Sequence, residues 1–174
     1  ILVQHSVAKV TLFSRNHQAI NKKSAREEEI LLAVPQKYPE ALLQSAPPQP
    51  GSPYRVVPLE RLQNEPFAMM SEASTLRQIQ EDIFRQNGLR PQVAFEATRA
   101  MTIFEVVSYN LCCALVCEYY VQIHQDRSVN LYALPEHPHW AMYASYRKGK
   151  YLSAAEKYLI QLVRQTHNAP CDPQ

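Results

Sequence analysis

Two uninterrupted apolar runs constrain the fold of this chain more than any other feature. Residues 30–34 read Ile-Leu-Leu-Ala-Val and are closed by Pro35, and residues 112–117 read Cys-Cys-Ala-Leu-Val-Cys. A run of this length without polar alternation is typical of a strand that is buried on both faces. Each run therefore predicts a central strand of a sheet.

The clearest helix lies between these two runs. Its apolar stripe repeats at helical spacing and consists of Leu76, Ile79, Ile83 and Phe84. Thr75, followed three residues later by Gln78, fits a capping box, and Ser74 and Ser71 are the other candidates for the cap. Gly88 favours a left-handed end to this helix.

Two more helices are predicted towards the C-terminus. Thr98 is a candidate cap for the first of them, whose buried stripe comprises Met101, Phe104, Val107 and Leu111. Ser153 and Glu156 form a capping box for the closing helix. The apolar face of that helix carries Ala155, Leu159, Leu162 and Val163.

Further strands alternate with these helices. We expect them at residues 1–3, 8–13, 67–70, 92–96, 129–134 and 140–147. A short helix is expected at 38–44, a Pro-rich loop at 45–53 and one helical turn at 59–62. The charged residues 22–29 are interpreted as a solvated turn. This order predicts an α/β fold with mainly parallel strands.

Charge, glycine content and hydropathy narrow the function classes. The formal net charge of +2 and the pI of about 8.4 are too balanced for a nucleic-acid surface. Only 3 glycines occur and they are isolated, which excludes a Gly-rich phosphate loop. No apolar run reaches about 18 residues, so no membrane span is predicted. The first residues do not resemble a secretory signal, and we expect a cytoplasmic protein.

No residue pattern indicates catalysis, a metal site or a cofactor. Of the four cysteines, Cys112, Cys113, Cys117 and Cys171, no pair has metal-ligand spacing, so buried free thiols are favoured over a metal or redox site. His137 and His139 flank Pro138, and a structural role is favoured over a metal pair. No nucleophile and base form a known motif, and we expect no enzyme.

Five segments occur in the order found in the regulatory region of LysR-type transcription regulators. They are EEEILLAVPQKYPE (27–40), PLERLQNEPFAMM (58–70), TLRQIQEDIFRQNGLRPQVAFEA (75–97), VVSYNLCCALVCEYYV (106–121) and YRKGKYLSAAEKYLIQLV (146–163). Together they span most of the chain, which resembles that family. In the fourth segment Asn110 and Cys112 stand where the family usually has glycines, and asparagine tolerates the left-handed turn.

The resemblance implies a periplasmic-binding-protein-like (type II) regulatory domain of two lobes, with part of the first lobe missing. By this map the second regulatory subdomain is residues 57–122, and residues 1–56 and 123–174 are the remainder of the first. The helix-turn-helix that would bind DNA precedes this region in the family, so DNA is a partner only of the full-length protein. Members of the family act as homo-oligomers.

The resemblance also implies where an effector binds. In the family the segment equivalent to residues 70–75 lines the cleft between the lobes, and helix N-termini attract anions. The candidate effector-binding residues are Met70, Ser71, Ser74, Thr75, Thr98 and Arg99. The alternative is that the hydroxyls only cap helices and that Met70 belongs to the core.

The function implied is that of an effector-sensing domain, which binds a small, anionic molecule between two lobes to control transcription. A fragment of a periplasmic-type solute-binding protein is the alternative. A helix-turn-helix upstream of Ile1 would favour the first, and a signal peptide there would favour the second. Neither alternative requires a cofactor, a metal or a membrane.

Overall fold

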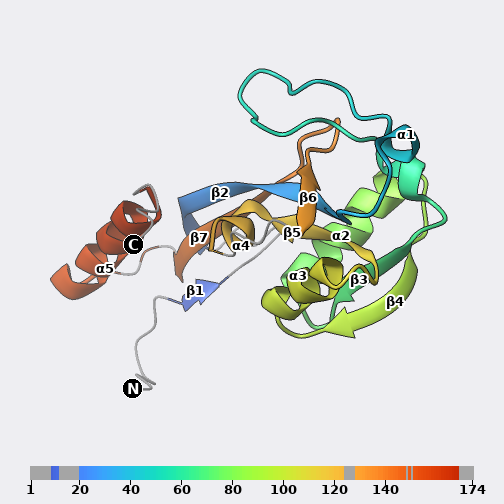
Figure 1. The fold of residues 1–174 in the computed structure, drawn as a ribbon. Helices are drawn as coiled ribbons and strands as arrows, with labels where there is room; N and C mark the ends of the chain where they lie inside the picture. Colours follow the sequence, from blue (N-terminus) through green and yellow to red (C-terminus); the bar gives the residue numbers. More distant parts are fainter. Residues whose placement is uncertain (1–8, 12–19, 124–127, 148, 150, 169–174) are drawn as a thin grey trace. The chain divides into compact units, whose positions relative to one another are not determined.

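The computed structural model describes residues 9–11, 20–123, 128–147, 149 and 151–168 (Figure 1). Its strands are β1 (Lys9–Thr11), β2 (Ile20–Pro35), β3 (Pro66–Met70), β4 (Gln92–Ala97), β5 (Cys113–Cys117), β6 (Val129–Tyr132) and β7 (His139–Arg147). Its α-helices are α1 (Glu40–Leu43), α2 (Thr75–Gln86), α3 (Ala100–Ser108), α4 (Glu118–Ile123) and α5 (Ala154–Asn168), and a single 3-10 turn covers Leu59–Leu62. None of the described helices has the length and apolar character needed to cross a bilayer. The strand predicted at residues 1–3 lies outside the described residues.

The chain divides into two compact units, residues 28–140 and residues 1–27 with 141–174. The predicted boundaries at 57 and 122 fall inside the first of these units. Strand pairing joins segments on both sides of these boundaries. Leu32 of β2 pairs with Leu115 of β5, which lies within 57–122, and with Tyr132 of β6, which lies after it. Residues on both sides of 57–122 therefore share one sheet with it.

The predicted buried strand at 30–34 is confirmed, but the solvated turn at 22–29 is wrong. β2 begins at Ile20, so the charged residues belong to the strand. Its neighbours in strand order are β7 and β5, which are distant in the sequence. Pairing with these strands holds the charged residues in extended conformation, although their polarity favours a turn. Glu28 and Glu29 are both buried in the strand.

The sheet is mixed, whereas mainly parallel strands were predicted. Strand β3 pairs in parallel with β4 and with β5, as expected for strands joined through helices. Strand β2 runs antiparallel to β5 and β6, and β1 runs antiparallel to β7. Among the strands described, parallel pairing joins β3, β4 and β5, the strands that α2 and α3 connect, and one isolated parallel bridge joins Val56 to Ala133.

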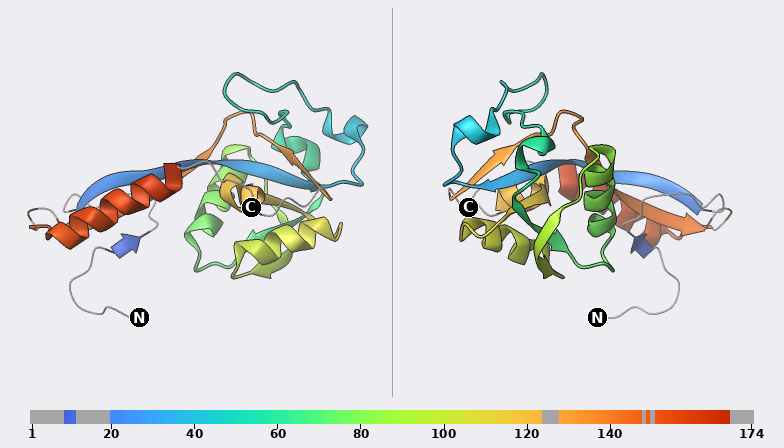
Figure 2. Two further views of the ribbon diagram at one scale, coloured as in Figure 1. Left: turned by 60° about the vertical axis from the view of Figure 1, so that its left-hand side comes forward. Right: turned by 90° about the vertical axis from the view of Figure 1, so that its right-hand side faces the viewer.

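Helices α2 and α3 cover opposite faces of the β5-β3-β4 part of the sheet (Figure 2). The crossover from β3 to β4 runs in one direction along the sheet and that from β4 to β5 runs back, so right-handed connections place the two helices on opposite sides. On the α2 side Phe67 meets Phe84 edge to face, with ring centroids 4.9 Å apart. Both rings are buried, which makes this pair part of the core beneath α2.

Both helices end in the same way. Gly88 has a φ of 67° and Asn110 a φ of 61°, so both predicted left-handed turns are confirmed. In α2 the Leu89 N–H donates to the Phe84 carbonyl, and in α3 the Leu111 N–H donates to the Val106 carbonyl. This is the Schellman pattern, which satisfies carbonyl groups at a helix end.

The predicted stripe of α3 is partly wrong. Phe104 and Val107 are buried as expected, but Ile103 is the third buried residue, whereas Leu111 is exposed. Leu111 lies beyond the left-handed Asn110, so it no longer follows the helical repeat. On the edge strand β4, Val93 and Phe95 are likewise exposed.

The closing helix begins at its predicted capping box. The Ser153 hydroxyl accepts from the Glu156 N–H (3.2 Å), and the Glu156 carboxylate accepts from the Ser153 N–H (2.9 Å). On the predicted apolar face, however, Leu159 and Leu162 are exposed, and Ile160 is the buried residue. Val163 is outside the described side chains.

Candidate functional site

Strands β3 and β4 bring all six candidate residues together at the carboxyl ends of these two strands. This end of the sheet is called the shared edge of β3 and β4 below. The two strands are parallel neighbours, and their last residues, Met70 and Ala97, are paired. The pairing continues one residue further, because the Ser71 N–H donates to the Ala97 carbonyl at 2.8 Å. The loops that lead into α2 and α3 therefore start side by side, at the carboxyl ends of parallel strands.

Ser74 is the residue that caps α2, so the alternative cap is correct and Thr75 as the cap is wrong. Ser74 has extended backbone, and its hydroxyl accepts from the Leu76 N–H at 3.2 Å. Thr75 is already the first helical residue. Ser71 contributes its carbonyl, which accepts from the Ser74 N–H at 2.9 Å and closes a tight turn. The three hydroxyls thus lie within the first turn of α2 and the loop before it.

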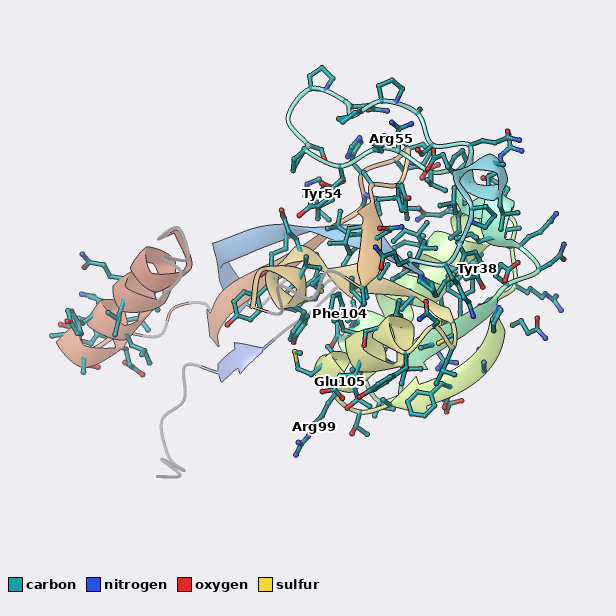
Figure 3. The ribbon with its side chains drawn as sticks, viewed as in Figure 1. Tyr38, Tyr54, Arg55, Arg99, Phe104 and Glu105 are labelled. Carbon is teal, nitrogen blue, oxygen red and sulfur yellow. The ribbon has the colours of Figure 1, made fainter. Side chains whose placement is uncertain are left out.

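The start of α3 differs from the prediction as well. The cap is Arg99, which has extended backbone and makes no side-chain capping hydrogen bond, so Thr98 as the cap is wrong. Thr98 and Arg99 are both exposed. Figure 3 shows the Arg99 side chain extending outward from the N-terminal end of α3. This edge of the sheet therefore carries one exposed guanidinium beside a helix start.

Met70 is held from α2 through its backbone. Its N–H donates to Gln80 Oε1 at 3.0 Å, and its carbonyl accepts from Arg77 Nη1 at 2.7 Å. The Met70 side chain is only 6% exposed, which favours a core role for the side chain itself.

Arg77 carries a second cation near this edge, but its charge is already balanced. Its Nη1 donates to Glu96 Oε1 at 2.6 Å and its Nε to Glu81 Oε1 at 2.7 Å. The hydrogen bond to Glu96, and then that to Glu81, holds the pKa of the Arg77 guanidinium above its ordinary value despite burial. With two carboxylates on one guanidinium, Arg77 adds no net positive charge for a ligand, whereas the exposed Arg99 does.

Arg77 and Gln80 are the residues of this region that the sequence interpretation missed. Both are buried, and both face the sheet together with Leu76 and Ile83. One signal was present: Gln80 lies four residues after Leu76 and three before Ile83, at the centre of the apolar stripe. A polar residue at such a position must find buried partners.

A second polar cluster ties a loop to β2. His137 Nδ1 lies 2.6 Å from Glu29 Oε1, and its Nε2 lies 3.0 Å from Gln49 Oε1. Tyr54, labelled in Figure 3, donates to Glu118 at 3.3 Å, and burial together with that carboxylate raises the pKa of Tyr54 to about 12. The two contacts of His137 join the Pro-rich loop to β2, and the Tyr54 hydrogen bond joins the residue after that loop to α4. In the part of the chain that the structure describes, no group of acidic, histidine and cysteine side chains could hold a metal ion.

Comparison with known proteins identifies the family. A model of the LysR substrate binding domain matches residues 10–168. No curated protein matches the chain.

Solved structures share the fold at low sequence identity. The regulatory domain of Synechocystis PCC6803 CcmR in complex with 2-PG has a TM-score of 0.72 and 15% identity, over 91% of this chain and 72% of that one. The effector binding domain of QuiR in complex with shikimate has a TM-score of 0.69 and 15% identity, over 90% and 69%. HinK, a LysR family transcriptional regulator from Pseudomonas aeruginosa, has a TM-score of 0.66 and 15% identity.

The match to HinK covers 90% of this chain but only 52% of HinK. The chain therefore spans about half the length of that regulator. Its mixed α/β sheet has the periplasmic-binding-protein-like (type II) fold of LysR regulatory domains. The chain belongs to the LysR substrate-binding domain family.

Proposed function

We propose that this chain is the effector-sensing region of a LysR-type transcription regulator and that it binds a small, anionic molecule at the shared edge of β3 and β4. The observation that carries this proposal is the placement of two helix starts side by side at that edge. Ser71, Ser74 and Thr75 lie at one of them, and Thr98 and Arg99 at the other.

The chemistry of this edge suits an anion. The first turn of a helix presents N–H groups and the positive end of the helix dipole. Arg99 adds an exposed guanidinium that can donate two parallel hydrogen bonds to a carboxylate or phosphate. Structures of this fold in complex with 2-PG and with shikimate support binding of a small molecule.

In the full-length protein, we propose, this binding controls DNA binding and transcription, and the protein acts as a cytoplasmic homo-oligomer. The second regulatory subdomain, proposed from the sequence at 57–122, lies within the compact unit of residues 28–140. The remaining segments then belong to the first subdomain. Both effector loops come from the second subdomain.

Alanine variants at Ser71, Ser74 and Thr75 and the variant Arg99→Gln test the site. A lost hydrogen bond to an anion is expected to weaken effector binding by roughly 1.5–3 kcal/mol, about ten- to a hundredfold in Kd. Ser74→Ala should also lower the free energy of unfolding by about 1 kcal/mol, because Ser74 caps α2. Ser71→Ala and Arg99→Gln should leave stability nearly unchanged, because neither side chain caps its helix.

The measurement is a thermal-shift titration of the full-length regulator with 2-PG, shikimate and short dicarboxylates, followed by a transcription assay. Arg85→Gln is the matched control for Arg99→Gln, since Arg85 is also an exposed arginine but lies in the last turn of α2, away from both helix starts. The site lies elsewhere if an effector is found and all four variants respond to it like the wild type. The proposed function fails if no small anion changes either readout.

The isolated chain is expected to show no sequence-specific affinity for DNA. Its charge is nearly balanced, with 18 Lys and Arg against 16 Asp and Glu, so few phosphate contacts can form. Fluorescence anisotropy with the operator of the full-length regulator measures this directly. A tight, salt-sensitive and sequence-selective signal from the chain alone would contradict it.

A further inference from the structure

The buried amide of Gln80 occupies the point where β3 and β5 separate. The parallel pairing of these strands covers Phe67 with Cys113 and Ala68 with Ala114. Immediately beyond it, Gln80 Oε1 accepts from the Met70 N–H (3.0 Å) and Gln80 Nε2 donates to the Leu115 carbonyl (2.9 Å). The side chain thus takes the place of the next hydrogen bonds of the ladder.

Both halves of that amide are committed to the backbone, in a site without water access. Gln80 is 0% exposed, so a lost partner would leave a buried N–H or carbonyl unsatisfied. One helical turn earlier, Arg77 donates to the carbonyl of the same Met70. The peptide groups on both sides of Met70 are therefore held by α2, and the next residue is Ser71, the first of the candidate loop.

From this geometry we infer that Gln80 is a positioning residue of the proposed effector loop: it fixes Met70 relative to the start of α2 and links both to β5. The inference rests on the proposed function for its purpose, because the positioned loop is the one assigned to the effector. The inference adds to the proposed function a structural link: through Gln80, the effector loop and α2 are both joined to β5. Leu115, the other partner of Gln80, is paired across the sheet with Leu32 of β2.

The variant Gln80→Glu makes this link controllable by pH. A protonated carboxyl has the shape of the amide, and it can donate to Leu115 and accept from Met70 as glutamine does. An ionised carboxylate only accepts, so it repels the Leu115 carbonyl. Burial favours the protonated form and raises the pKa of the introduced carboxyl, by several units in documented cases. The link is then intact at low pH and broken at high pH.

The experiment records the amide resonances of Ser71, Ser74 and Leu76 in ¹H–¹⁵N spectra, without any ligand, between about pH 5 and about pH 9. In Gln80→Glu we expect these resonances to match the wild type at low pH. As the pH rises they should move away together, with the same midpoint as the amide of Val116, whose N–H shares a peptide group with the Leu115 carbonyl. In Gln80→Met, which retains the length but neither hydrogen bond, they should be displaced at every pH.

Gln86→Glu is the matched control, because Gln86 is an exposed glutamine on the same helix. It should titrate in the ordinary range of glutamate and leave the loop resonances in place. A general loss of stability would lower the melting temperature, but it would not move the loop resonances of the folded protein with pH. A return of these resonances to their wild-type positions at low pH therefore indicates that Gln80 positions the loop.

The inference is overturned if the loop resonances of folded Gln80→Met coincide with those of the wild type. It is also overturned if those of Gln80→Glu fail to return at low pH, or stay at wild-type positions up to the pH at which the variant unfolds. If Gln80→Met does not fold, the Gln80→Glu series decides alone. Because no ligand is used, this result is independent of whether an effector binds.

Discussion

Replacing Phe67 with alanine is expected to lower the free energy of unfolding by about 3–5 kcal/mol, the range for deleting a buried aromatic ring. Phe67 is 1% exposed and meets Phe84 of α2 edge to face. Its removal leaves a cavity between β3 and α2, the helix that Ser74 caps. Urea unfolding, followed by circular dichroism, measures the loss.

Phe95→Ala is the control for this prediction. Phe95 lies on the neighbouring strand β4 but is 39% exposed, so its truncation should cost less than about 1.5 kcal/mol. Equal losses for the two variants would show that the contact between β3 and α2 is not a main source of stability. If Phe67→Ala lowers the free energy of unfolding but leaves its dependence on urea concentration unchanged, the substitution acts on the folded state and not on the unfolded state.

The thiols of Cys112, Cys113 and Cys117 are expected to resist alkylation in the folded protein. All three are free and buried. Burial, reinforced by the charge of Glu65, raises the pKa of Cys113 to about 12, and burial also raises the pKa of Cys112 and Cys117. Only the thiolate reacts, so at neutral pH the smaller thiolate fraction alone should slow alkylation of Cys113 by about three thousandfold relative to a free cysteine with a pKa near 8.5.

The measurement is the rate of labelling by iodoacetamide, read by mass spectrometry for each cysteine. The background Cys171→Ser leaves only the thiols of Cys112, Cys113 and Cys117, and the urea-unfolded chain provides the reference rate. Because each pKa is raised, the folded-state rate should increase with pH well above 8.5, where the unfolded chain has already reached its plateau. Labelling of Cys113 and Cys117 within seconds at neutral pH, without denaturant, would contradict the assignment of β5 as a fully buried strand.

The parts of the fold that the sequence predicted are those that local patterns determine. The apolar runs at 30–34 and 112–117 became the buried portions of β2 and β5, and Gly88 and Asn110 end α2 and α3 as expected. The charged half of β2 was missed because no local pattern marks it. Its strand conformation depends on pairing within the sheet, and β7 follows it by more than a hundred residues.

The candidate site shows the same division. That its six residues meet at one edge follows from parallel pairing of β3 and β4, which the alternation of strands and helices predicted. The caps of α2 and α3 both lie one residue away from the first predicted positions. At α2, Ser74 and Thr75 have equivalent hydroxyls, so only the backbone decides between them, and the extended residue is Ser74. At α3 the extended residue is Arg99, which makes no side-chain capping hydrogen bond, so no side-chain signal marks it. Gln80 cannot be recognised from the apolar stripe itself, because its burial depends on partners in β3 and β5 that lie far away in the sequence.

The division into two compact units has a consequence for how the protein is made. Residues 28–140 form one continuous stretch, whereas the other unit joins residues 1–27 to 141–174. Domains fold as units during synthesis, in the order in which they leave the ribosome. The continuous unit can therefore complete its core before residues 141–168 have been translated. The part of β2 that precedes residue 28 is paired with β7, which is completed later. In a nascent chain stalled shortly after residue 140 has emerged, residues 28–140 should therefore resist protease, whereas residues 20–27 should not.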